Sequence, residues 1–107
     1  MNHEEITMHA KVAKSLAEAA CAASDDRGTC NLDATFWPLS KGEKAAPIIA
    51  SLRRAGLSAS ESRWIGRGIF IQPPGAGMAN KRYASNQALF SSLKAAGAPV
   101  LCYYQMD

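Results

Sequence analysis

The sequence predicts an α+β protein in which helices pack on a four-stranded antiparallel sheet. Three stretches repeat apolar residues at helical spacing, four short stretches have the alternation or composition of β-strands, and turn-forming residues separate them. In chain order these elements are one helix followed by βαββαβ. Two right-handed βαβ crossovers around a central hairpin describe the split-βαβ, or ferredoxin-like, sandwich. At 107 residues the chain is expected to be a single domain, with the N-terminal helix over residues 1–28 and the βαββαβ core over residues 29–107.

The first helix is expected over residues 4–26. Asn2 is placed to cap its start, and Gly28 suits the left-handed position just past its end. Its predicted buried face is the stripe that recurs at steps of four and three, namely Met8, Val12, Leu16, Ala19 and Ala23. This stripe is rich in alanine and should pack closely on something flat, which is either the sheet or a second copy of the chain.

The core elements follow from the remaining patterns. Alternation over residues 29–37 predicts the first strand, with Cys30, Leu32, Ala34 and Phe36 facing the core. A helix is expected from about residue 45 to Gly56, with Pro47 in its first turn, and a second helix is expected from a cap at Asn80 to Gly97. The other strands are expected at residues 58–65, 68–72 and 100–106, the first two joined as a hairpin.

The composition is that of a globular protein, with 48% hydrophobic and 20% charged residues. The longest apolar run, residues 19–23, is too short to cross a bilayer, and the N-terminus lacks the basic start of a signal peptide. The sequence therefore predicts a cytoplasmic protein without a membrane partner.

Net charge is +3, but it is unevenly distributed along the chain. Residues 1–40 carry −3, residues 41–82 carry +6, and residues 83–107 are neutral. The positive charge therefore belongs to the middle of the chain. This asymmetry favours an acidic partner, although a solvated basic face is the commoner explanation.

The three cysteines, Cys21, Cys30 and Cys102, lack the spacing of a zinc site. In the predicted fold the first and last strands are neighbours, which brings Cys30 and Cys102 within reach of one another on the core face. A reduced buried pair is expected, because a disulfide would require an oxidising compartment.

The basic hairpin is the candidate partner-binding site. Trp64 lies between Arg63 and Arg67, and further basic residues flank the hairpin at Arg53, Arg54, Lys81 and Arg82. An exposed Trp64 would stack on a base or anchor a protein, while the guanidinium groups hold phosphates. In the alternative, Trp64 belongs to the core and the arginines form a solvated rim. The third strand lacks two aromatic residues of the RNA-recognition motif.

A glycine-rich loop that enters a helix is the second candidate site. Free N–H groups and cations there would hold a phosphate or carboxylate, with Gly75, Gly77, Asn80 and Lys81 as the binding residues. The loop matches neither the Walker A motif nor the dinucleotide fingerprint. A plain connection is the alternative.

No catalytic residues, metal ligands or cofactors are predicted. His3 and His9 are six residues apart and do not share a helix face, and the thiol of Cys30 points away from Asn31 and Asp33. The open face of the sheet is instead expected to serve a protein partner, unless the N-terminal helix covers it. Its predicted members are Asn31, Asp33, Thr35, Trp37, Ser60, Ser62, Trp64, Phe70, Tyr103 and Gln105.

Three short segments carry a resemblance to a known class of proteins. They are GTCNLD at residues 28–33, RWIG at residues 63–66 and YYQMD at residues 103–107. Together they resemble small proteins encoded by phages and mobile elements. The resemblance implies a regulator or inhibitor of host machinery, of the anti-CRISPR type, which is usually not an enzyme. Many such inhibitors are acidic mimics of DNA, whereas this chain is basic.

The leading hypothesis is therefore a small non-enzymatic binding protein, a monomer or homodimer, that acts on a host protein or nucleoprotein complex. The alternative is direct nucleic-acid binding by the basic hairpin. A third hypothesis is capture of a small anionic ligand or nucleotide at the glycine loop.

Overall fold

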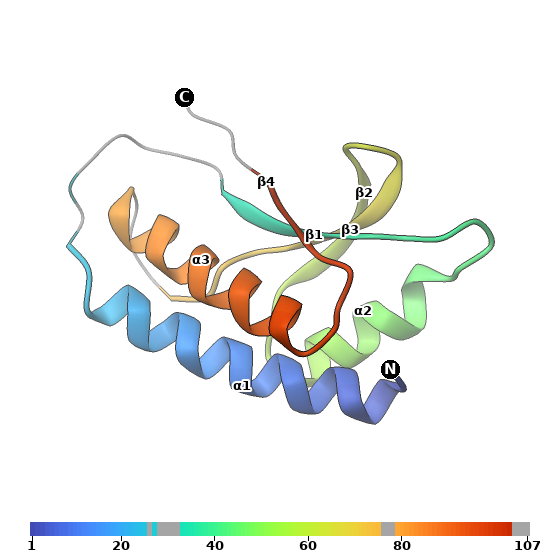
Figure 1. Cartoon of the computed structure of the whole chain (residues 1–107), viewed down its shortest axis with the longest axis horizontal. Coiled ribbons are helices and arrows are strands. Elements are labelled where there is room, and N and C mark those ends of the chain that lie inside the picture. The colour runs from blue at the N-terminus through green and yellow to red at the C-terminus, as the bar shows by residue number, and fades with distance from the viewer. Residues whose placement is uncertain (26, 28–32, 76–78, 104–107) are drawn as a thin grey trace.

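The computed structural model describes residues 1–25, 27, 33–75 and 79–103 (Figure 1). The sheet has the order β2-β3-β1-β4, and every neighbouring pair of strands is antiparallel. This arrangement confirms the predicted ferredoxin-like fold. Its elements are α1 (His3–Ala22), β1 (Ala34–Pro38), α2 (Ala45–Arg54), β2 (Ala59–Arg63), β3 (Arg67–Ile71), α3 (Asn80–Ala95) and β4 (Leu101–Tyr103).

All three helices lie on one side of the sheet (Figure 1). α2 and α3 pack against the strands, and α1 packs across α2 and α3 on the side away from the sheet. The N-terminal helix therefore does not cover the open face of the sheet.

The buried face of α1 is not the predicted one. Met8, Val12 and Leu16 are 54%, 52% and 51% exposed, and the predicted stripe points to solvent. The inward residues are mostly smaller, namely Ile6, Thr7, Ala10, Ala13, Ala17 and Cys21. Small side chains allow helix axes to approach closely, and α1 uses them against α3 and α2. The Thr7 hydroxyl also donates to the Ser51 carbonyl of α2 at 3.0 Å, which fixes this face inward.

The predicted cap of α1 is confirmed. Asn2 Oδ1 accepts from the Glu5 N–H at 2.8 Å, and Glu5 Oε1 accepts from the Asn2 N–H at 3.0 Å. This reciprocal capping box satisfies two donors that the first turn would otherwise leave unpaired. The helix ends earlier than predicted, at Ala22, while Gly28 lies outside the described residues.

β1 presents the opposite face to the one predicted. Thr35 and Trp37 point toward the helices, and Phe36 points to the other side of the sheet. The Thr35 hydroxyl donates to Asn86 Oδ1 at 3.0 Å, and Asn86 Nδ2 donates to the Ala34 carbonyl at 3.3 Å. These buried hydrogen bonds between β1 and α3 thus fix which residues of β1 face the helices. The predicted core positions Cys30 and Leu32 lie outside the described residues.

The first and last strands are neighbours, as predicted. Thr35 of β1 is the register partner of Cys102 in β4. Cys102 Sγ accepts weak hydrogen bonds from Asn86 Nδ2 and Gln87 Nε2, at 3.9 and 3.7 Å. α3 begins one residue earlier than predicted, since Ala79 rather than Asn80 is its N-cap.

β1 and β3 approach one another closely at Gly68. A Cβ atom at Gly68 would lie 2.3 Å from Cζ of Phe36 and 2.7 Å from the backbone oxygen of Trp37. Glycine is therefore required at this point by the close approach of the Phe36 ring, because any side chain would displace it.

Substitution Gly68→Ala should lower the free energy of unfolding by about 1–3 kcal/mol, because the added methyl group must displace Phe36 or the β1 backbone. Urea denaturation measures the change. The matched control is Ser62→Ala, since Ser62 is exposed and is the register partner of Gly68 on β2. The control should change stability by less than about 0.5 kcal/mol. A Gly68→Ala protein as stable as the wild type would contradict the packing described.

Candidate partner-binding site

Four aromatic rings form a cluster on the open face of the sheet. Phe36 of β1, Phe70 of β3 and Tyr103 of β4 are joined by Trp64 from the β2–β3 turn. The centroid of Trp64 lies 5.5 Å from that of Phe36 and 5.0 Å from that of Tyr103, both edge to face. Phe70 lies 5.0 Å from both Phe36 and Tyr103. These are favourable geometries for aromatic pairs.

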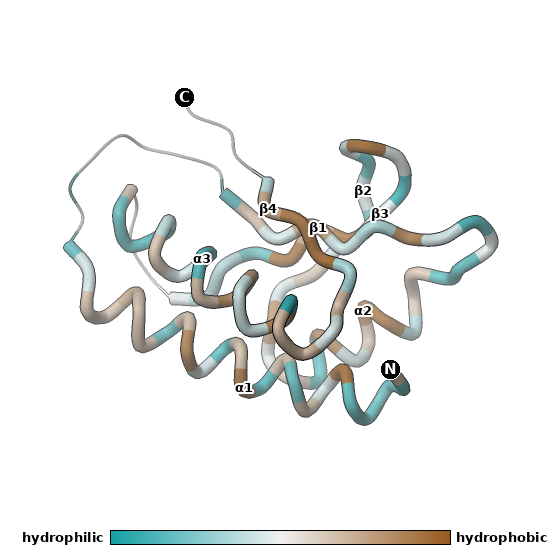
Figure 2. The backbone as a smooth tube through the Cα atoms, viewed as in Figure 1, coloured by the Kyte–Doolittle hydropathy of each residue, from teal (hydrophilic) through white to brown (hydrophobic). Residues whose placement is uncertain are grey.

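The cluster is closed at its centre and apolar at its surface. Phe36 is fully buried, yet Trp64 remains 42% exposed, Ile65 60% and Leu101 38%. The β2–β3 turn accordingly contains a hydrophobic segment at its tip, coloured brown in Figure 2. We call Trp64, Ile65 and Leu101, together with Phe70 and Tyr103, the aromatic face. Exposed apolar groups gathered in this way are typical of interaction surfaces.

The sequence left Trp64 either exposed for binding or packed in the core. In the structure it is partly packed on other rings and partly exposed. Its strand ends at Arg63, earlier than predicted, and the Trp64 N–H donates to the Gly66 carbonyl at 3.1 Å within the turn. Gly66 has a φ of 93°, which favours glycine and turns the chain back into β3. As a result one part of the indole covers Phe36 while another part stays open to solvent.

The predicted membership of the open face is correct on β2, β3 and β4 but wrong on β1. Ser60 and Ser62 oppose Phe70 and Gly68, and so share their face. Thr35 and Trp37 face the helices, while Asp33, just before β1, is buried beside Arg82 rather than exposed on the sheet. Asn31 and Gln105 lie outside the described residues. Sequence reasoning missed Phe36, although a glycine on the neighbouring strand is a signal that an aromatic ring lies over it.

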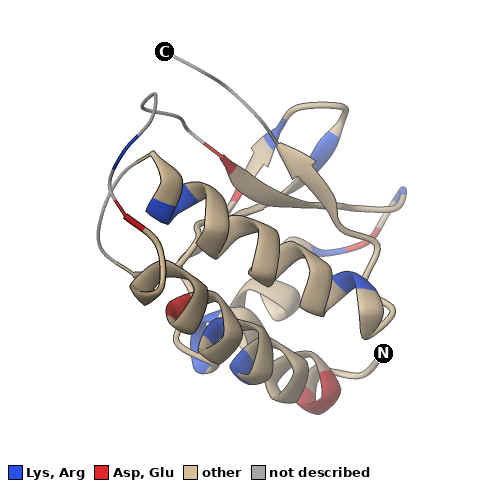
Figure 3. Ribbon diagram, turned by 60° about the vertical axis from the view of Figure 1, so that its left-hand side comes forward, with Lys and Arg blue, Asp and Glu red and all other residues tan. Residues whose placement is uncertain are grey.

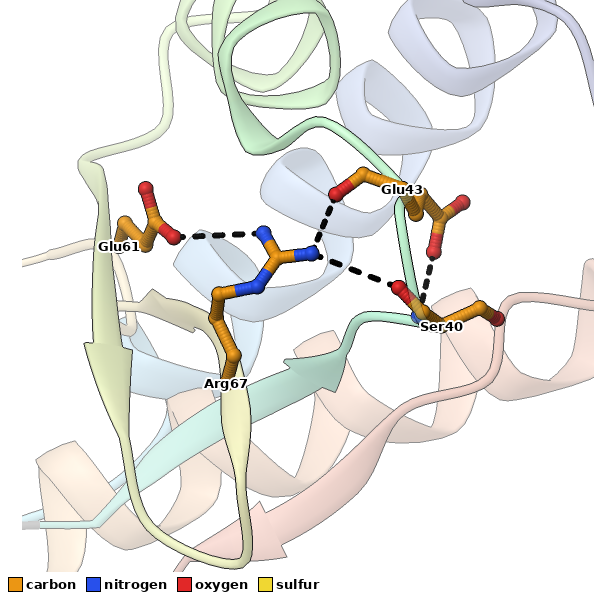
Figure 4. Close-up of polar contacts among 4 residues, drawn as sticks. All are labelled: Ser40, Glu43, Glu61 and Arg67. Carbon is orange, nitrogen blue, oxygen red and sulfur yellow. Dashed lines mark hydrogen bonds and ion pairs between the residues drawn. The ribbon is translucent and has the colours of Figure 1, made fainter.

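Arg67 bonds to neighbouring elements of the fold at the protein surface (Figure 4). Its guanidinium donates to Glu61 Oε2 at 3.4 Å, to the Ser40 carbonyl at 3.4 Å and to the Glu43 carbonyl. Glu43 Oε1 in turn accepts from the Ser40 N–H at 2.9 Å, at the capping-box spacing of the turn before α2. Arg67 therefore ties the hairpin to the loop that precedes α2.

The other predicted basic residues are not brought together. Arg53 donates from Nε and Nη2 to the Ala59 carbonyl, at 3.2 and 2.9 Å. Arg54 borders a shallow hollow beside α1, and Arg63 is exposed next to Trp64. Figure 3 shows Lys and Arg spread over several elements of the described chain. Of the predicted partner-binding residues, Trp64 belongs to the aromatic face, whereas Arg63 is the register partner of Arg67 and shares its side of the sheet.

The start of α3 contacts the end of α1 instead of an open anion site. Lys81 Nζ donates to the Cys21 carbonyl at 3.0 Å, and Asn80 Nδ2 donates to Asp25 Oδ1 at 3.1 Å. The Asn80 N–H donates to the Arg27 carbonyl at 3.1 Å. A Cβ atom at Gly75 would lie 2.7 Å from the Cys21 sulfur, so this glycine permits close packing. Gly77 lies outside the described residues.

A buried acidic group lies beside the first turn of α3. Asp33 is only 2% exposed, and burial raises the pKa of its carboxyl, while the charge of Arg82 opposes that increase. Arg82 is itself oriented by its bond from Nη2 to Gln72 Oε1 at 2.7 Å. Asp33 and Arg82 lie on the helical side of the sheet, away from the aromatic face.

Elsewhere, a half-open hollow of about 380 Å³ lies where α1 and α2 begin. Its lining includes His3, Ile6, Trp37, Lys44, Ile48 and Pro99, and none of the residues predicted for the basic hairpin or the glycine loop. Within the described ranges, no group of three or more His, Cys, Asp or Glu side chains is placed to hold a metal ion. In the same part of the chain, no helix has the length and apolarity needed to cross a membrane.

No protein-family model, curated protein or solved structure matches the chain.

Arg67→Ala should lower the free energy of unfolding by about 1 kcal/mol, because it removes hydrogen bonds from a charged donor in a partly solvated position. The matched control is Arg63→Ala. Arg63 is the register partner of Arg67 and is exposed, so its removal should cost less than about 0.5 kcal/mol. Equal losses in urea denaturation would contradict the structural role of Arg67.

Stability should fall with rising pH relative to the variant Asp33→Asn, which cannot ionise. Since the pKa of Asp33 is raised in the folded protein, the native state binds more protons than the unfolded state. The wild type is therefore most favoured below about pH 4, the ordinary carboxyl pKa, and loses stability as pH rises through the raised pKa. Chemical denaturation of both proteins from pH 3 to pH 8 measures the difference. A difference that is constant or grows with pH would contradict the assignment.

Proposed function

We propose that the protein is a binding protein that attaches to another protein, or to a protein within a nucleoprotein complex, through the aromatic face. The observation that carries the proposal is the exposed Trp64–Ile65 pair, in which Trp64 is the most exposed part of a cluster of four packed rings. Tryptophan and tyrosine are enriched among the residues that dominate binding energy in protein interfaces.

The ring contacts support a preformed site. Trp64 is already oriented by its edge-to-face contacts with Phe36 and Tyr103, so little side-chain entropy remains to be lost on binding. Leu101 on the edge strand β4 adds apolar area. The resemblance to phage and mobile-element proteins makes a host protein the expected target, and a non-enzymatic mode of action fits this surface.

Direct binding of a single-stranded nucleic acid is the second candidate. A four-stranded antiparallel sheet with aromatic side chains on its central strands β1 and β3 is the arrangement on which bases stack in RNA-binding domains. Here the indole of Trp64 covers Phe36, and the predicted cations Arg53 and Arg67 are bonded within the fold. The protein partner is therefore the better supported of the two.

Replacing an exposed residue of the aromatic face should strongly reduce partner capture. Tagged wild type, Trp64→Ala and Ile65→Ser proteins are used to recover partners from host lysate, with and without nuclease. We expect each variant to lower recovery by about 10- to 30-fold, the loss of a central interface residue. Ile65 is the second test because it is 60% exposed and can be changed with little risk to folding.

Tyr83→Ala is the matched control, since Tyr83 is an aromatic residue on α3 with 48% exposure, close to that of Trp64. It should leave recovery unchanged. Equal recovery by the Trp64 and Ile65 variants and the wild type would remove the aromatic face as the binding site. Binding of labelled single-stranded DNA or RNA that weakens steeply with salt, and is lost in Arg63→Ala, would favour the second candidate instead.

A further inference from the structure

The outer face of α1 carries an apolar seam that the monomer leaves uncovered. Met8, Val12 and Leu16 are each more than half exposed, on the face of α1 opposite to its buried alanines. Met8, Val12, Ser15, Ala19 and Ala22 are exposed at steps of four and three, and we call this stripe the α1 seam. The exposed Leu16 flanks it on the side opposite Lys11 and Glu18. This is the spacing by which two helices pack side by side along a shared stripe. Figure 1 places α1 at the side of the molecule farthest from the sheet.

We propose that a second copy of this chain covers the α1 seam, with the two α1 helices antiparallel about a twofold axis. The first argument is side-chain size. The N-terminal half of the seam has large residues, Met8 and Val12, and the C-terminal half has small ones, Ser15 and Ala19. In an antiparallel pair with Val12 opposite the partner's Ser15, Met8 faces the partner's Ala19. Large residues then fill the space that small ones leave in these central layers of the contact.

A parallel pair would not fill this space. It would set Met8 against Met8 and Val12 against Val12, and would leave the small C-terminal halves facing each other across a gap. The distribution of sizes along the α1 seam therefore selects the antiparallel orientation.

The second argument is charge. Lys11 and Glu18 are seven residues apart, so they flank the α1 seam on the same side. A twofold axis between antiparallel helices brings that flank of one protomer against the same flank of the other. Lys11 then approaches the partner's Glu18, and Glu18 approaches the partner's Lys11, so that two equivalent ion pairs form. Since Glu18 contacts Lys14 of its own helix only at 4.0 Å, it remains available for this pairing.

A third charge strengthens the match. Arg54 of α2 borders a shallow hollow together with Glu4, Met8, Lys11 and Val12, on the Lys11 side of the α1 seam. The carboxylate of the partner's Glu18 would therefore meet a rim of net positive charge, formed by two cations and the carboxylate of Glu4. In each protomer the positive rim therefore lies beside Met8 and Val12, and the negative Glu18 lies beside Ser15 and Ala19.

Dimerisation in this way has a consequence for binding. α1 lies on the opposite side of the protein from the aromatic face, because α2 and α3 separate it from the sheet. A dimer through the α1 seam therefore presents two aromatic faces outward. Such a protein would hold two partners, or two sites on one large partner, and would gain avidity from doing so.

The test is the association state of the full chain by sedimentation velocity. One helix face per protomer is a small interface, so we expect reversible dimers with a dissociation constant on the order of 10 µM. Val12→Glu places a charge at the centre of the seam and should weaken dimerisation at least about 30-fold. Circular dichroism confirms folding, which the exposed position of Val12 should preserve.

Charge exchange tests the orientation. Lys11→Glu and Glu18→Lys should each weaken the dimer about 10-fold by placing like charges together, and the double variant should recover most of the affinity. Ile65→Ser is the control on the far side of the protein, and should leave dimerisation unchanged. This control also separates the two proposals, because the α1 variants at low concentration should still capture a partner in lysate through the aromatic face.

Three results would overturn the inference. A wild type that stays monomeric to about 500 µM, well above the expected dissociation constant, would show that no copy covers the seam. A Val12→Glu protein that dimerises as well as the wild type would place the interface elsewhere. Single charge variants that have no effect, or a double variant weaker than both, would reject the antiparallel pairing.

Discussion

The contact between the ring of Phe36 and the backbone at Gly68 is the constraint on which the open face of the sheet depends. A side chain at residue 68 would clash with Phe36 at 2.3 Å, so glycine is what lets β1 and β3 accept a large aromatic on this side. Once Phe36 occupies the open face, the alternation of the strand sends Thr35 and Trp37 toward the helices. Trp37 then joins the main core, and Thr35 bonds to Asn86.

The same contact explains the hairpin. A phenylalanine on an uncovered sheet face would expose a large apolar area to water, and Trp64 removes most of that cost by folding from the β2–β3 turn over the ring. The indole, Phe70 and Tyr103 then support one another through edge contacts. The result is a second, smaller apolar cluster on the side of the sheet opposite the main core, with its outer surface left open.

Charge counts along the chain are a poor guide to the charge that a partner meets. The middle segment carries +6, yet Arg53 and Arg67 donate to backbone carbonyls, Lys81 bonds to the end of α1, and Arg82 offsets a buried Asp33. Guanidinium groups suit such work because several N–H donors act together in a fixed geometry. Much of the positive charge in this segment therefore joins elements of the fold, and apolar surface distinguishes the aromatic face more than charge does.

The order of elements, the strand order and the Asn2 cap followed from the sequence alone, because local periodicity, turn residues and the handedness of crossovers act over short distances. The faces did not. α1 has apolar residues on both sides, and its inward side was decided by close packing against α2 and α3 and by the bond from Thr7 to Ser51. β1 has large residues on both sides, and a shift of one position exchanges them. That choice was made by Asn86 and Gly68, which are distant in sequence, so only the tertiary structure could decide which aromatic residues reach the surface.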